Sequence, residues 1–402
     1  MSQTDKLMSL FNIHPGEGRL VLLALGYAIL LYVANVLART VSYALFLAEF
    51  DAATLPYAYI GVAVLATLVT TIYLKLNERW PLSRVLIGVH VFLLLTLLGY
   101  WLGIGRGAGS WLLFSLPIYF GVNNTLTISS FWNLLGRLYN LQQAKRLFGL
   151  LSSGEHMATI ATGFVAPVLV GWFGAPNLFL VAALVMAGTI ALLLYIVRRQ
   201  AEQMQEPGQE QTGGTKAKPA ESLFKDPYVT LIIRLFALFI LGIYFVDNIF
   251  YSQAELQYPT EDEMAAFIGV FFGVMGAISL FVQIFVAGRV LNRFGLRAIM
   301  LATPTGLLAT TVLFALVGTF SAWQMALFWL ATAAGLYRLV LDAVDSTASN
   351  LLYQPLPAQQ RTQAQTTVAG IIYPLSIGLT GLILLFLIDG FNFGPVQFTA
   401  FS

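Results

Sequence analysis

Long apolar stretches, each about long enough to cross a lipid bilayer, recur along the whole chain. A crossing helix needs roughly 20 predominantly apolar residues. Such windows lie at residues 20–48, 56–76, 84–103, 110–136, 147–172 and 176–197, and then at 228–252, 264–288, 297–317, 322–350 and 364–388. The pattern predicts an all-α integral membrane protein with eleven visible spans.

A polar stretch at residues 198–226 interrupts the apolar windows. It is rich in Gln, Glu, Gly and Lys and too poor in apolar residues to bury a core, which is typical of a flexible linker. Asp226 followed by Pro227 indicates the start of the next helix. We therefore expect a six-helix half at residues 1–197, a cytoplasmic linker at 198–226 and a second half at 227–402.

The last residues, FNFGPVQFTAFS, look like the start of a further apolar segment. We expect a twelfth span that is truncated here, with the alternative of an eleven-span protein. A longer polypeptide could also carry a fused soluble domain after residue 402.

Composition supports the membrane assignment and excludes several other functions. Hydrophobic residues make up 58% of the chain and charged residues 10%, whereas soluble domains contain about 25% charged residues. A net charge of +2 gives no case for a nucleic-acid partner. We find no GxxxxGK[ST] loop for ATP-driven pumping, and three histidines without cysteine give no credible metal cluster. We expect no enzyme activity and no cofactor.

The basic residues predict the orientation, because cytoplasmic loops of membrane proteins are enriched in Lys and Arg. With a cytoplasmic N-terminus, 17 of the 21 basic residues fall on the cytoplasmic side, and Arg106 alone lies clearly outside. The remaining three, Arg39, Arg234 and Arg338, lie inside predicted spans.

Two short matches at nearly one spacing indicate an internal repeat. NLL at 133–135 and QQ at 142–143 recur as NLL at 350–352 and QQ at 359–360, both 217 residues later. LNERWPLSR at 76–84 has a counterpart in LNRFGLR at 291–297. The repeat predicts two pseudo-symmetric six-helix halves, an architecture in which transporters place the substrate site between the halves near the bilayer midplane.

Two motifs resemble known transporter families. GRVLNRFGLR resembles the cytoplasmic 8–9 loop of the major facilitator superfamily through Gly288, Arg289, Arg293, Gly295 and Arg297, with Asn292 where an acidic residue is expected. FWNLLGRLYNLQQAKRLFGLLSSGEHMATIATG is similar to the fourth and fifth spans of the nucleotide (ATP/ADP) translocase family, and QAKRLFGL is its most specific part.

The resemblance implies a major-facilitator-type bundle, a small-molecule substrate and a place in the bacterial cytoplasmic (inner) membrane. The chain keeps Arg39 of the translocase pattern, but Ser42 and Tyr43 stand where a basic–acidic pair is expected. Glu155 and His156 are bulky insertions in a small-residue stretch of the fifth span.

Ionisable groups at membrane depth are costly and usually face a cavity or a partner, so they are the candidate site residues. At helical spacing Ser152, Glu155, Thr159 and Thr162 form one polar stripe. The substrate-binding candidates are Asn35, Arg39, Asn123, Thr127, Arg137, Tyr244 and Arg338. The coupling or gating candidates are Glu155, His156, Asp247, Asp342 and Asp345. Arg338 and Asp342 could instead form an ion pair within one helix.

The charges predicted at membrane depth leave three functions open. Arg39 and Arg338 carry two positive charges, whereas the four predicted carboxylates carry four negative charges, so the net charge at membrane depth is minus two. The four carboxylates are Glu155, Asp247, Asp342 and Asp345. A nucleotide would therefore need Arg137 and Arg234 near the membrane edge, protonated acids or a bound cation. The leading hypothesis is a carrier of nucleotides or related organic anions by alternating access. The alternatives are a proton-coupled carrier of a smaller solute and a non-transporting membrane sensor fused to a soluble domain.

Overall fold

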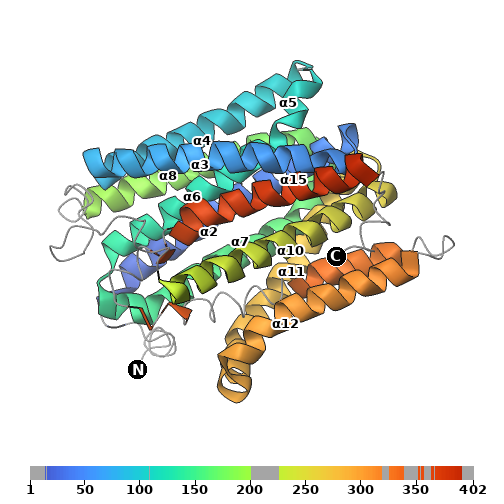
Figure 1. The fold of residues 1–402 in the computed structure, drawn as a ribbon. Helices are drawn as coiled ribbons and strands as arrows, with labels where there is room; N and C mark the ends of the chain where they lie inside the picture. Colours follow the sequence, from blue (N-terminus) through green and yellow to red (C-terminus); the bar gives the residue numbers. More distant parts are fainter. Residues whose placement is uncertain are drawn as a thin grey trace.

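A computed structural model describes residues 14, 16–107, 109–200, 226–318, 326–338, 352–353, 355–356, 364–365 and 367–391. These residues form a bundle of long helices, and the described ranges contain no strand (Figure 1). Within them, eight helices are long and apolar enough to cross a membrane. The prediction of an all-α multi-pass membrane protein is confirmed.

The N-terminal half, residues 14–200, contains six long helices and three short ones. The long helices are α2 (Gly18–Glu49), α3 (Leu55–Arg79), α4 (Leu82–Gly105), α6 (Leu116–Leu138), α7 (Leu141–Phe173) and α8 (Leu178–Arg199). The short ones are the turn η1 (Ala52–Thr54), α5 (Ser110–Phe114) and the turn η2 (Ala175–Asn177).

The C-terminal half, residues 226–391, contains α10 (Pro227–Gln257), α11 (Glu261–Phe285), α12 (Ala287–Gly318) and α15 (Tyr373–Phe391). A further helix covers residues 326–338, and a π-helical turn, η4 (Val368–Ile372), leads into α15. The predicted linker at 201–225 and the predicted start of a twelfth span at 392–402 lie outside the described residues.

Local sequence signals explain several helix starts. The Asp226 carboxylate accepts hydrogen bonds from the backbone N–H groups of the first turn of α10, and Pro227 follows at the first helical position, as predicted. Asn140 and Gln143 form a reciprocal capping box at the start of α7. Gly174 follows the last residue of α7 and has a φ of 81°, a backbone conformation that residues other than glycine rarely adopt.

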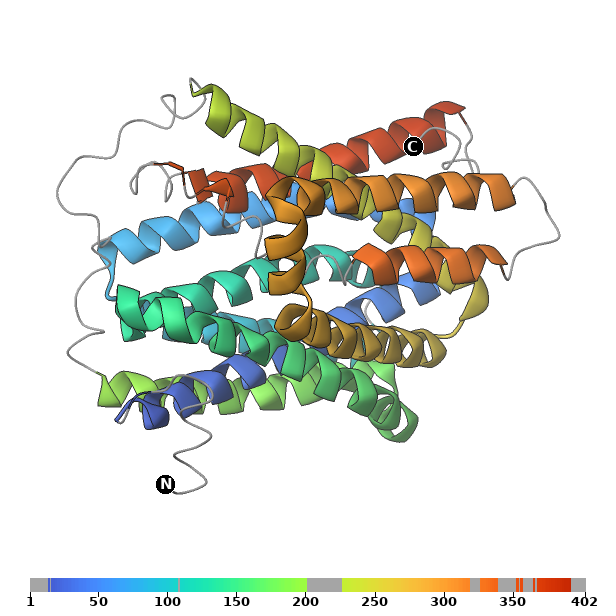
Figure 2. The same cartoon turned by 90° about the horizontal axis from the view of Figure 1, so that it is seen from below.

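Two predicted spans differ from the structure. The window at 110–136 is not one helix, because Ser115 separates α5 from α6 and Pro117 cannot donate the backbone hydrogen bond that would continue the helix. α12 bends sharply at Gly295, where φ is 76° and ψ 170°, so residues 287–294 and the ninth span run in different directions (Figure 2). A positive φ at this bend requires glycine.

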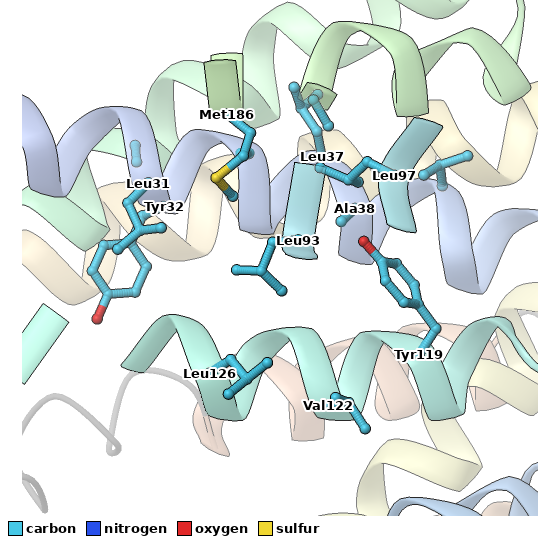
Figure 3. Packing of buried hydrophobic residues seen from close by; sticks show 14 of the residues in the cluster. Leu31, Tyr32, Leu37, Ala38, Leu93, Leu97, Tyr119, Val122, Leu126 and Met186 are labelled. Atoms are coloured by element: carbon cyan, nitrogen blue, oxygen red, sulfur yellow. The ribbon is translucent and has the colours of Figure 1, made fainter. Parts of the chain in front are cut away.

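One large apolar core lies mostly in the N-terminal half, where α2, α4, α6 and α8 contribute to it, and extends into the C-terminal half (Figure 3). Leu31, Leu93 and Leu97 are almost completely buried in it. One polar contact interrupts this core: the Tyr27 hydroxyl lies 3.0 Å from His90 Nε2, while His90 Nδ1 lies 2.7 Å from the Leu86 carbonyl. Both ring nitrogens are satisfied, so His90 stabilises the packing of α2 against α4.

The most extensive contacts between the two halves are those of α7 with α11 and of α3 with α15, and α2 also packs against α11 (Figure 1). Glycines allow the close approach: a Cβ atom on Gly163 of α7 would collide with the backbone of Gly273 on α11. A Cβ on Gly378 of α15 would lie 2.6 Å from Ala63 Cβ of α3. We call the end of the bundle with the α2–α3 and α7–α8 turns the distal end, and the end where α2 begins the proximal end. These glycine contacts lie toward the distal end.

Candidate substrate site

Arg39 of α2 lies inside the bundle beside the C-terminal half. Its guanidinium carbon Cζ is 3.5 Å from the ring centroid of Phe272 on α11, a cation–π contact between the halves. Arg39 also lies within electrostatic range of Glu155 on α7 and of Tyr251 on α10. Its Nε atom is buried and has no hydrogen-bond partner among the described residues. The guanidinium is therefore positioned by a ring and keeps a donor for an incoming acceptor.

Arg338, the last described residue of the helix over residues 326–338, pairs with Asp247 of α10. The Arg338 Nη1 to Asp247 Oδ1 distance is 2.7 Å, and the two side chains are 18% and 20% exposed. Arg338 also lies within electrostatic range of Arg39. Asp342 and Asp345 lie outside the described residues, so the alternative pairing of Arg338 with Asp342 stays a prediction.

Glu155 and His156 lie on α7, where the sequence predicted a polar stripe. The Glu155 carboxylate accepts a hydrogen bond from the Tyr32 hydroxyl of α2 and, as described above, lies near Arg39. The Thr159 hydroxyl donates to the Glu155 backbone carbonyl at 2.9 Å, so that hydroxyl is already engaged with its own helix. His156 is half-buried next to Glu155. Glu155 is therefore the member of the stripe that lies near Arg39.

The buried amides of α2 and α6 hold these helices together. Asn123 Nδ2 donates to Asn35 Oδ1 at 2.7 Å, and Asn35 Nδ2 donates to Asn124 Oδ1 at 3.0 Å. Thr127 lies one turn further along α6 and is fully buried. Because both ends of the Asn35 amide are engaged, Asn35 and Asn123 position α2, which carries Arg39, against α6.

Tyrosines close the distal side of the site. Tyr43 of α2 stacks on Tyr251 of α10 with ring centroids 4.5 Å apart and an interplanar angle of 5°. Tyr244 meets Tyr59 edge-on at 5.1 Å. A cavity of about 40 Å³ beside Tyr43, Tyr59 and Tyr244 reaches Asn124 and has room for a few water molecules only. The stacked pair of Tyr43 and Tyr251 therefore joins the two halves one helical turn distal to Arg39.

Other predicted residues lie away from this centre. Arg137 is in the last turn of α6, fourteen residues beyond Asn123, which corresponds to about 21 Å along a helix toward the proximal end. Of the loop motif, Arg289 and Arg293 are exposed, and Gly295 forms the bend of α12. Gly288 lies in the first turn of α12, and the Arg297 side chain is outside what the structure describes.

Sequence reasoning missed two contributors to the site. Tyr43 lies one helical turn after Arg39 on the same face of α2, so its spacing could have indicated it. Phe272 lies in an apolar run of α11 and carries no local signal, because the contact with Arg39 depends on how the halves meet.

Comparisons with known proteins agree with this architecture. The sequence profile of the Major Facilitator Superfamily matches residues 20–383. The chain is 26% identical over 276 residues to "ADP,ATP carrier protein 1" of Chlamydia muridarum, an alignment that covers 59% of this chain and 51% of that protein. It is 24% identical over 202 residues to "ADP,ATP carrier protein 1, chloroplastic" of Arabidopsis thaliana, covering 46% and 31%. The chain spans about half the length, or less, of these curated relatives.

Solved structures share the fold at low sequence identity. A mutant form of the nucleoside transporter NupG superposes with a TM-score of 0.68 at 12% identity and covers 94% of each chain. A bacterial homologue of the iron transporter ferroportin, in an inward-facing state, gives a TM-score of 0.68 at 15% identity and covers 95% of each chain. These likenesses support the fold alone.

Proposed function

The chain belongs to the Major Facilitator Superfamily, a family of membrane transporters, and we propose that it exchanges nucleotides or related organic anions across the membrane by alternating access. The observation that carries this proposal is the convergence of two arginines, one from each half. Arg39 comes from α2 and Arg338 from the helix at 326–338, and each lies within electrostatic range of the other. The similarity to proteins named ADP,ATP carriers supports the choice of substrate class.

An anion between the two arginines would relieve the repulsion between them. Guanidinium groups bind phosphate or carboxylate oxygens through paired N–H donors, so one polyanion could contact both halves at once. Such a ligand favours the states in which the halves close around it. An empty carrier lacks that bridging anion, which would make return without substrate slow and favour exchange over one-way transport.

The two carboxylates compete with the substrate for these arginines. Asp247 occupies Arg338, and Glu155 lies near Arg39, so the four described charges sum to zero. An incoming anion would displace both acids from their partners, and Asp247, which is only 20% exposed, would then be stabilised by a proton. Proton uptake that accompanies anion binding is therefore part of the proposal.

A cytoplasmic N-terminus fits the described helices. Arg79, Arg137, Arg198 and Arg199 lie in the last turns of α3, α6 and α8, all at the proximal end. Arg106 follows α4 at the distal end. By the excess of positive charge on cytoplasmic sides, the proximal end faces the cytoplasm and the distal end faces outward. We propose the bacterial inner membrane as its location.

Uptake into liposomes tests the function directly. The full-length protein is reconstituted, and uptake of labelled ATP is measured with and without ADP trapped inside, at two pH values. We expect uptake that needs internal nucleotide, is lost in Arg39→Ala and persists in Arg234→Gln, a variant of an exposed arginine on α10. Absence of uptake by verified, correctly oriented protein with every nucleotide tried contradicts nucleotide exchange.

The acids of the site favour one second candidate, a proton-coupled carrier of a smaller solute. Glu155 lies on the exposed face of α7 and is hydrogen-bonded to Tyr32, so a change of its protonation would reach α2 directly. This candidate predicts uptake driven by a pH gradient without internal substrate. Loss of that uptake in Glu155→Gln, with no effect of trapped nucleotide, would favour it over exchange.

A further inference from the structure

Two carboxylates of the C-terminal half bind backbone groups in the distal turns of the N-terminal half. Glu255 Oε2, near the end of α10, accepts a hydrogen bond of 2.7 Å from the Ala52 N–H in η1. Asp262 Oδ1, near the start of α11, accepts one of 2.6 Å from the Ala175 N–H in η2. Ala52 and Ala175 are both fully buried. One short segment, residues 255–262, is thus attached to two separate turns.

The Ala52 peptide is held from both sides. Asn248 of α10 donates from Nδ2 to the Ala52 carbonyl at 3.3 Å, while Glu255 accepts from the Ala52 N–H. Asn248 and Glu255 are seven residues apart, two turns along one face of α10. Tyr251 lies between them on that face and stacks on Tyr43. These contacts connect the halves at the distal end, next to the apolar core that also contains Ala52, Tyr43 and Tyr251.

We propose that Glu255 and Asp262 are positioning residues that form a distal latch, which keeps the outward-facing end of the carrier closed. A buried backbone N–H that loses its acceptor is left unsatisfied, which is costly. Breaking the latch would therefore shift the protein toward states open at the distal end. The inference rests on the proposed function, because it assumes alternating access.

The latch shares a helix face with the candidate substrate site. Asp247, Tyr251 and Glu255 follow one another at four-residue spacing on α10, so all three lie on one stripe. Asp247 pairs with Arg338 in the site, and Glu255 binds Ala52 at the distal end. An anion that takes Arg338 from Asp247 would act on the same helix that closes the distal end. This continuity gives α10 the means to couple substrate binding to opening.

Thiol labelling in the absence of substrate tests the latch. The chain contains no cysteine, so a single Thr162→Cys can serve as a reporter. Thr162 is buried on the face of α7 that packs on α11 through Gly163. We expect a membrane-impermeant maleimide to label this cysteine several-fold faster in Glu255→Ala and in Asp262→Ala. Glu255→Gln, which keeps an acceptor for the Ala52 N–H, should label more slowly than Glu255→Ala.

Two controls separate opening from loss of structure. Glu263→Ala removes an exposed carboxylate next to Asp262 and should leave the labelling rate unchanged. Thr189→Cys is a buried reporter in α8, within the N-terminal half, and should stay protected in every variant. Unchanged labelling at position 162 in both latch variants overturns the inference, and so does faster labelling at position 189 or in Glu263→Ala. Because no substrate is present, failure here leaves nucleotide exchange to be judged by uptake.

Discussion

An aromatic ring of the C-terminal half faces the Arg39 guanidinium. Phe272 faces it at 3.5 Å, and a cation–π contact of this kind contributes about 0.5–2 kcal/mol. We expect Phe272→Leu to weaken anion binding several-fold, because the leucine keeps the packing but no longer orients the charge. Nucleotide-induced thermal stabilisation of the purified protein measures the effect. Phe281→Leu, at an exposed ring on the same helix, is the matched control and should bind normally.

Asp247 should act as an internal competitor of the substrate. Its carboxylate occupies Arg338 at 2.7 Å, so Asp247→Asn makes that arginine more available to an anion. We expect tighter nucleotide binding, with the dissociation constant lowered several-fold, which corresponds to about 1 kcal/mol. Titration calorimetry at constant pH checks the direction. Weaker binding in Asp247→Asn would mean that the carboxylate supports the site and does not compete for it.

At the level of single residues, the sequence indicated which charged side chains come together better than it indicated the partners of the buried amides. Arg39, Glu155, Asp247 and Arg338 were predicted because ionisable groups at membrane depth need partners, and the structure brings these four together. Asn35 was predicted to bind substrate from its place on the Arg39 face. Its amide bonds to α6, a contact that helical spacing within one segment cannot reveal, and its role in substrate binding stays a prediction.

Between elements, Glu17 joins the start of α2 to the start of α7. Its carboxylate accepts hydrogen bonds of 2.9 Å from Gln143 and Arg146. The Gln143 bond is the largest cause that lowers the pKa of Glu17 to about 2, and Arg146 and the His14 backbone N–H act in the same direction. A carboxyl with a lowered pKa stabilises the folded protein above its ordinary pKa, and this stability is lost as the pH falls toward 2.

The melting temperature should report this link between α2 and α7. We expect wild type to melt above Glu17→Gln at pH 7, by an amount equivalent to less than about 1 kcal/mol because the pair is accessible to solvent. The gap should stay constant down to about pH 4.5 and shrink at lower pH. Glu49→Gln, at the other end of α2, serves as the comparison. A gap that does not change with pH would show that the charge of Glu17 does not stabilise the fold.

The sequence predicted the positions of helices wherever a long apolar stretch or a helix-start signal marks them. Apolar length predicted the spans, and Asp226–Pro227 predicted the start of α10. Pro117 indicates the break at Ser115, because proline favours the first turn of a helix. The break was not predicted, because the apolar stretch continues on both sides of Ser115. The distal latch could not be predicted, because Glu255 and Asp262 bind backbone groups, and backbone groups leave no trace in a sequence pattern.

At the scale of the whole molecule, the seam between α7 and α11 must open for substrate to enter from the distal end. Thr159 of α7 and Gly276 of α11 face each other across it, and a Cβ on Gly276 would lie 3.2 Å from Thr159 Cβ. Disulfides join Cβ atoms about 3.5–4.5 Å apart, so a shift of a few tenths of an ångström accommodates one. The cysteine-free chain makes the pair Thr159→Cys and Gly276→Cys the only thiols present.

Oxidation of this pair should lock the distal end closed and stop exchange. We expect nucleotide uptake to fall at least about tenfold under oxidising conditions and to recover when a reductant is added. Each single-cysteine variant should transport equally in both conditions, which separates the crosslink from the substitutions themselves. If the crosslinked protein still exchanges nucleotide, the halves do not part between α7 and α11. The path for the anion would then have to open elsewhere, for example between α3 and α15 or between α2 and α11, which also join the halves.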